Sequence, residues 1–161
     1  MRGYPETYGR LPVVPGPIDV MERDDAWVAP DAIEGLLRSL GECHRLTDSD
    51  FADPKWMVEP GRGNSLSHLV ALDGQLPIGF LAGYPHVGHI ALIGALRTSE
   101  GVGAALMDAF VARSVSAGAL NLSVVLDTEV AHRWRRRTFF ERIGFRSVDG
   151  SALHFRRPLP S

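Results

Sequence analysis

The chain has 161 residues, of which 45% are hydrophobic and 22% charged, and its formal net charge is −2. This composition is that of a folded globular protein and excludes a disordered or fibrous chain. A single cysteine, Cys43, excludes an internal disulfide and a cysteine-based zinc cage. No apolar run approaches the roughly 18 residues of a membrane span, and the N-terminus lacks a signal-peptide core, so we expect a cytoplasmic protein.

Charge is divided unevenly along the chain. Residues 1–80 hold thirteen Asp and Glu against seven Lys and Arg, whereas residues 81–161 hold six against ten. Because local charge steers charged ligands, the first part favours a cation and the second an anion. Asp48, Asp50 and Asp53 are the acids expected beside the cation. The alternative is that the surface charge is uneven without any functional role.

The N-terminal part predicts an arm, a strand and a helix. Residues 1–16, rich in proline and glycine, form an irregular arm ahead of one domain over residues 17–161. A short strand over 18–22 precedes a helix over 32–46, in which leucines recur at helical spacing after Asp31 as N-cap. Turn-forming residues mixed with aromatic ones then predict a short helix and loop over 47–64, as one wall of a pocket.

The remainder predicts strands first and then alternating helices. Residues 67–72 and 75–84 form a hairpin around Asp73-Gly74. Pro77 is expected near the start of its strand or at an irregular spot of that strand. The elements expected after it are a buried strand over 87–96, a helix over 102–117, a strand over 120–127, a helix over 130–143, and short strands over 145–148 and 152–159. This order predicts an α/β (α+β) fold: a mixed, twisted sheet of six or seven strands with about four helices on both faces.

The strongest local motif joins the buried strand to the next helix. In ALIGALRTSEGVGAALM, Gly101-Val102-Gly103 opens the helix, where free N–H groups can bind an anion. Small residues at a helix start also serve packing, which is the alternative. The motif is neither a dinucleotide fingerprint nor a P-loop.

A second motif, FFERIGF over residues 139–145, follows at the end of the last helix. With both motifs in this order and spacing, the chain resembles the GCN5-related N-acetyltransferase (GNAT) superfamily over roughly residues 65–150. The resemblance implies the GNAT acyltransferase fold, with acetyl-CoA or another acyl-CoA as co-substrate. It implies that pantetheine pairs with the backbone of Ala91, Leu92 and Ile93. It also implies that pyrophosphate binds the backbone of Ser99, Glu100, Gly101, Val102, Gly103 and Ala104.

Three positions depart from the family pattern. The Arg or Gln that opens the loop is Thr98, with Arg97 beside it, and the Asn that often opens the last helix is Arg133. Arg133 begins a basic run that also contains Arg135, Arg136 and Arg137. This run either binds a CoA phosphate or forms a solvated helix face. The tyrosine that can protonate the CoA thiolate is Phe140, which keeps the ring and loses the acid.

The resemblance implies transfer of an acyl group, most simply acetyl, to an amine of a small molecule or peptide. The amine must lose a proton, and Glu22, His89 and Asp127 are the candidate bases. Because the tyrosine is absent, a catalytically silent protein that binds CoA or another ligand is the alternative. We expect no metal, because no His or Asp stands at ligand spacing, and no nucleic-acid partner, because the chain is net acidic. A homodimer is common in this family.

Overall fold

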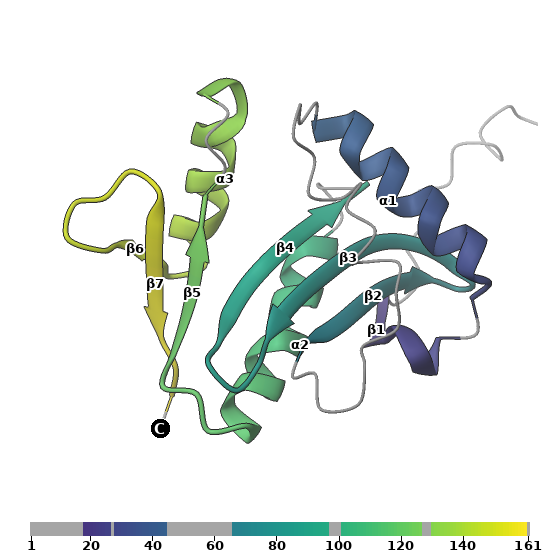
Figure 1. Ribbon diagram of the computed structural model, residues 1–161, viewed down its shortest axis with the longest axis horizontal. Coiled ribbons are helices and arrows are strands. Elements are labelled where there is room, and N and C mark those ends of the chain that lie inside the picture. Colours follow the sequence, from purple (N-terminus) through teal and green to yellow (C-terminus); the bar gives the residue numbers. More distant parts are fainter. Residues whose placement is uncertain (1–17, 27, 45–65, 97–100, 127–129, 161) are drawn as a thin grey trace, which may run out of the picture.

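The structure is a computed structural model that describes residues 18–26, 28–44, 66–96, 101–126 and 130–160. Seven strands form one sheet in the order β1-β2-β3-β4-β5-β7-β6 (Figure 1). The strands are β1 (Ile18–Glu22), β2 (Ser67–Asp73), β3 (Leu76–Tyr84), β4 (His89–Ala95), β5 (Asn121–Val125), β6 (Arg146–Ser147) and β7 (His154–Pro158). Every neighbouring pair is antiparallel except β4 and β5, which run parallel.

Helices cover both faces of the sheet, as predicted. The described α-helices are α1 (Pro30–His44), α2 (Val102–Ser116) and α3 (Val130–Arg142), and a 3₁₀ turn, η2 (Arg23–Asp25), follows β1. Helix α1 packs its apolar stripe on β2, β3 and β4, in a cluster that includes Leu37, Phe80 and Leu92. Helices α2 and α3 pack on the opposite face, around Phe110 and Phe140. In the part of the chain that is described, no helix is long and apolar enough to cross a membrane.

Two local predictions need correction. Helix α1 begins at Pro30, so Asp31 lies within its first turn and is not its N-cap. A proline at the start of a helix has a suitable φ angle and no N–H that needs a partner. The hairpin of β2 and β3 is confirmed, but its loop is Gly74-Gln75 because Asp73 pairs with Leu76. Gly74 has φ +62°, which fits a type II′ turn with glycine first.

The expected irregularity at Pro77 is confirmed. Ala71 pairs with Gly79 and Leu72 with Pro77, so Ile78 is an extra residue on β3, a bulge directly after the proline. The short helix and loop expected over residues 47–64 lie outside the described residues.

Glycines in β3 let α2 lie close to the sheet. A Cβ at Gly79 would come within 2.6 Å of the Val102 side chain, and one at Gly83 within 2.7 Å of the Phe110 ring. Because β3 has no side chain at these points, the helix rests almost on its backbone. The close contact at Gly79, which pairs with Ala95 at the end of β4, fixes the first turn of α2 beside that strand end.

Gly88 fixes the junction of β4 and β5, and its substitution tests this. It has φ +69°, and an added Cβ would lie 1.9 Å from the Asn121 carbonyl oxygen. Gly118 has a similar φ of +87° with nothing within 4 Å of an added Cβ. We expect Gly118→Ala to lower the free energy of unfolding by about 1–2 kcal/mol through backbone strain alone, and Gly88→Ala by about 2 kcal/mol more. Urea denaturation measures both, and equal losses would contradict this account.

Candidate functional site

The parallel pair β4 and β5 separates after two residues. His89 pairs with Ser123 and Ile90 with Val124, whereas β4 continues to Ala95 with no further partner among the described residues of β5. Figure 1 shows the two strands diverging toward their carboxyl ends. Beyond Ile90, the edge of β4 that faces β5 therefore offers backbone N–H and C=O groups to another extended chain.

A bulge in β4 explains the separation. On the β3 side, Gly83 pairs with Ile90 and Ala82 with Leu92, so Ala91 is an extra residue on β4. A bulge bends its strand and increases the local twist. Since it comes directly after the last residue paired with β5, the bulge turns β4 away from β5 at this point.

The start of α2 lies beside the carboxyl end of β4. Gly101 is its N-cap, with φ +79° and no side-chain capping hydrogen bond, and the first turn contains no acid. The N–H groups of Val102, Gly103 and Ala104 have no partner within the helix, because the first intrahelical bonds come later along it. Free N–H groups and the positive end of the helix dipole together suit an anion.

The two glycines of the motif have different structural roles. Gly101 adopts a left-handed conformation that other residues enter only with strain, and nothing lies within 4 Å of an added Cβ. At Gly103, an added Cβ would lie 3.2 Å from the Phe139 ring of α3. Gly103 therefore permits close packing of two helices, which is the alternative that the sequence left open.

His89 stands where the two strands part. Its Nδ1 lies 3.0 Å from the Ser123 Oγ. Burial lowers the pKa of the His89 imidazole below its usual 6.5. The side chain is half-buried and is neutral near pH 7, so its ring can accept a proton.

Comparison with solved structures identifies the fold. No protein-family model and no curated protein matches the chain. Among solved structures, an acetyltransferase of the GNAT family from Staphylococcus aureus Mu50 is 11% identical, with 89% of this chain and 100% of that chain covered and a TM-score of 0.67. The PaiA N-acetyltransferase from Thermoplasma acidophilum, in complex with coenzyme A, is 13% identical, with 88% and 99% covered and a TM-score of 0.65. An aminoglycoside 6′-N-acetyltransferase complexed with coenzyme A is 18% identical, with 90% and 98% covered and a TM-score of 0.63.

The chain has the GNAT fold. The resemblance drawn from two short motifs is thereby confirmed for the fold. Within it, the described residues expected around the cofactor fall into two neighbouring groups. The first group is on β4 (Ala91, Leu92, Ile93) and the second at the start of α2 (Gly101, Val102, Gly103, Ala104). Ser99, Glu100 and Asp127 lie outside the described residues, as does the side chain of Arg133.

Glu22 lies away from the carboxyl end of β4. It ends β1, three strands from β4, which is about 14 Å across the sheet. Its carboxylate accepts a hydrogen bond from the Ser67 hydroxyl and pairs with Arg113 Nε at 2.8 Å. The structure does not bring Glu22 to the point where β4 and β5 diverge, so it is a poor candidate for the base within the GNAT fold.

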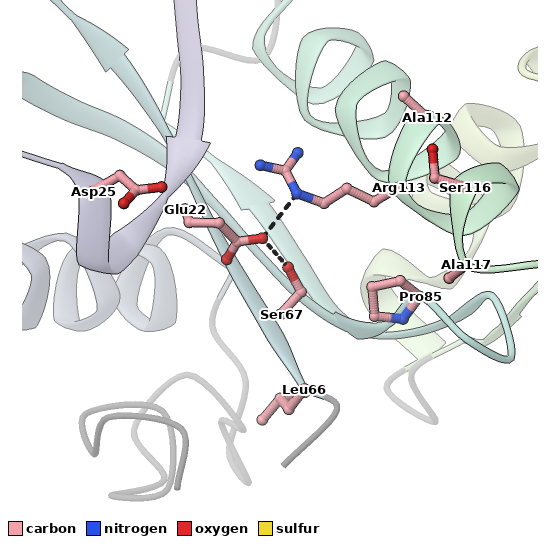
Figure 2. A pocket seen from close by; sticks show the side chains of 9 residues that line it. All are labelled: Glu22, Asp25, Leu66, Ser67, Pro85, Ala112, Arg113, Ser116 and Ala117. Carbon is pink, nitrogen blue, oxygen red and sulfur yellow. Dashed lines mark hydrogen bonds and ion pairs between the residues drawn. The ribbon is translucent and has the colours of Figure 1, made fainter. Parts of the chain in front are cut away.

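These charged groups line a hollow of about 770 Å³ at the other end of α2 (Figure 2). Figure 2 shows Glu22 between Ser67 and Arg113, with Pro85 and Ser116 farther along the wall. The 15 residues of α2 span about 22 Å, so the hollow is far from the helix start. A second, smaller hollow of about 420 Å³ lies between α2 and the end of α3, and Ala104, Arg142 and Arg157 are among its lining residues.

Phe140 belongs to the core. Only 3% of its surface is exposed, and its ring meets those of Phe139 and Phe145 edge to face, each at 5.2 Å between centroids. One arginine of the basic run before Phe140 already has partners in the protein. Arg137 Nε donates to Glu141 at 2.7 Å, and the Arg137 guanidinium lies 5.8 Å from the centre of the Phe155 ring.

A tyrosine at position 140 tests how closed this ring cluster is. Phe140→Tyr places a hydroxyl among aromatic rings, and a buried hydroxyl without a partner costs about 1–3 kcal/mol. We expect urea denaturation to show a loss of that size. A Tyr variant as stable as the wild type would mean that residue 140 opens onto a polar space, contrary to the packing seen.

Proposed function

We propose that this protein transfers an acyl group, acetyl in the simplest case, from an acyl-CoA to an amine. The observation that supports this best is the parting of β4 and β5 at the Ala91 bulge, directly ahead of a helix with a free N-terminus. Two solved structures of the same fold are complexes with coenzyme A, which adds support.

The residues present fit an acyl-CoA. Its pantetheine arm is an extended chain with amide groups, which the unpaired backbone of Ala91 to Ile93 can bind as a further strand would. Its pyrophosphate suits the N–H groups at the start of α2. Ala104 also lines the smaller hollow. Arg142 and Arg157, on the walls of that hollow, suit the one phosphate of CoA that is not part of the pyrophosphate. Most of these contacts use backbone groups, so the site tolerates many side chains.

His89 is the base in this proposal. An acyl-CoA supplies a thioester whose carbonyl carbon forms a C–N bond with the amine as its C–S bond breaks. The neutral His89 ring accepts the proton that the amine must lose, directly or through one water. Ser123 holds the ring by its contact with Nδ1, which leaves Nε2 for the substrate side.

No side-chain acid is needed at residue 140. A thiol has a pKa near 8.5, so the thiolate departs readily and takes a proton from water. Phe140 accordingly contributes packing, and Phe140→Leu should retain turnover.

The direct test incubates the protein with acetyl-CoA and a panel of amines, and follows free thiol. Thiol release that depends on an amine supports acyl transfer. Binding of CoA by calorimetry without amine-dependent release would favour a silent CoA-binding protein, and failure to bind CoA would overturn the assignment of the site.

A charge placed on the first turn of α2 tests the phosphate site. Ala104 is exposed there, and Ala112 is exposed two turns farther along the same helix. We expect Ala104→Glu to weaken CoA binding at least tenfold, about 1.4 kcal/mol, because a carboxylate competes with and repels the phosphates. Ala112→Glu should leave affinity unchanged. Calorimetry measures both, and equal affinities would refute the site at α2.

The pH profile tests His89. Because burial lowers its pKa below 6.5, protonation removes the base only below that pH, and kcat/KM should fall on the acid side from there. His89→Gln should lower kcat by about 10²–10⁴ and abolish that acid limb. The control His86→Gln, at an exposed position in the turn before β4, should keep rate and profile. An unchanged limb in His89→Gln would assign the base elsewhere.

A further inference from the structure

One row of side chains crosses the sheet at the level of His89. The register pairs Tyr84 with His89, His89 with Ser123, and Ser123 with Arg156, on strands β3, β4, β5 and β7 in turn. Directly paired residues point to the same face of a sheet. The four side chains therefore form one line across four strands, although Ser123 and Arg156 are far from Tyr84 and His89 in the sequence.

This line lies on the face turned away from α2 and α3. Ile90 and Leu122, which alternate with His89 and Ser123 along their strands, are buried in the core cluster of those two helices. On the other face, the α1 cluster extends no farther than β4. Val125 is the next residue of β5 on that face and is 49% exposed. Figure 1 shows none of the described helices in front of β5 and β7.

The open face beside His89 is positively charged. Arg156 is exposed, and none of the described residues gives it an ion pair or hydrogen bond. His154, also exposed, precedes it by two residues on the same face of β7. The segments of β4, β5 and β7 contain no Asp or Glu at all. Among the residues of these three strands, an anion that approaches His89 over β5 thus meets a guanidinium and no opposing acid.

From this row, we infer that the acceptor amine carries an acid group, carboxylate or phosphate, which Arg156 binds while the amine faces His89. The inference rests on the proposed function, because it assumes that the acyl group is delivered where β4 and β5 part. Two strand spacings separate His89 from Arg156, about 10 Å between their Cα atoms. His89 contacts Ser123, and Arg156 is the residue paired with Ser123 on the next strand, so a small molecule spans the distance. A guanidinium binds two oxygens of either acid at once, which fixes the orientation of the amine.

Matched acceptors separate acid recognition from amine chemistry. We would measure kcat/KM for 4-aminobutanoate against 4-aminobutanamide, and for 3-aminopropyl phosphate against 3-aminopropanol. The wild type should favour at least one acid over its neutral partner by tenfold or more, and added salt should reduce the preference. The pair that shows the larger preference distinguishes carboxylate from phosphate.

Arg156→Gln should remove this preference chiefly by raising KM for the acid, with little change for the neutral amines. The control Arg38→Gln changes an exposed arginine of α1 that pairs with Glu34, and should keep the preference. A wild type that acylates neutral amines equally well, or a preference that survives Arg156→Gln, overturns this inference and leaves acyl transfer standing. Loss of CoA binding, or thiol release with no amine at all, overturns both.

Discussion

The bend of β4 at Ala91 is the feature on which the site depends. A regular strand in this place would pair with β5 along its full length and use all its backbone groups in the sheet. With one extra residue against β3, β4 keeps its antiparallel partner and loses its parallel one after Ile90. The sheet thereby stays continuous through β3 while a stretch of backbone becomes available for a ligand.

The rest of the fold holds this opening in position. Gly88 lets the turn before β4 pass against Asn121 of β5, so the two strands begin in contact before they part. The backbone N–H of Ser123 donates to the carbonyl of Gly88 at 2.8 Å. At the other end, contact of Val102 with the bare backbone at Gly79 places the free turn of α2 beside the end of β4. Small residues thus determine both ends of the site.

The sequence predicted the order and type of the described strands and α-helices because each depends on local periodicity. The positive-φ glycines that follow helices, Gly118 and Gly144, could be found in this way, as could the strand and the helix between them. The bulge at Ala91 could not, since residues 90–95 (IALIGA) are apolar throughout and carry no mark of an extra residue. The hairpin loop was misplaced by one residue for a similar reason: Asp73-Gly74 and Gly74-Gln75 are both acceptable turns, and cross-strand pairing decides between them.

Side-chain partnerships were harder to predict than backbone roles. His89 was one of three candidate bases, and only the register shows that it meets Ser123 at the parting of the strands, while Glu22 is held by Ser67 and Arg113 elsewhere. The uneven charge of the two halves has a structural counterpart, because Arg156 comes from the basic half and lies on the open face of the sheet. Backbone groups form the cofactor side of the proposed site, and they exist in any sequence with this fold. Side chains form the other side, so the identity of the acceptor depends on residues that the fold leaves free to vary.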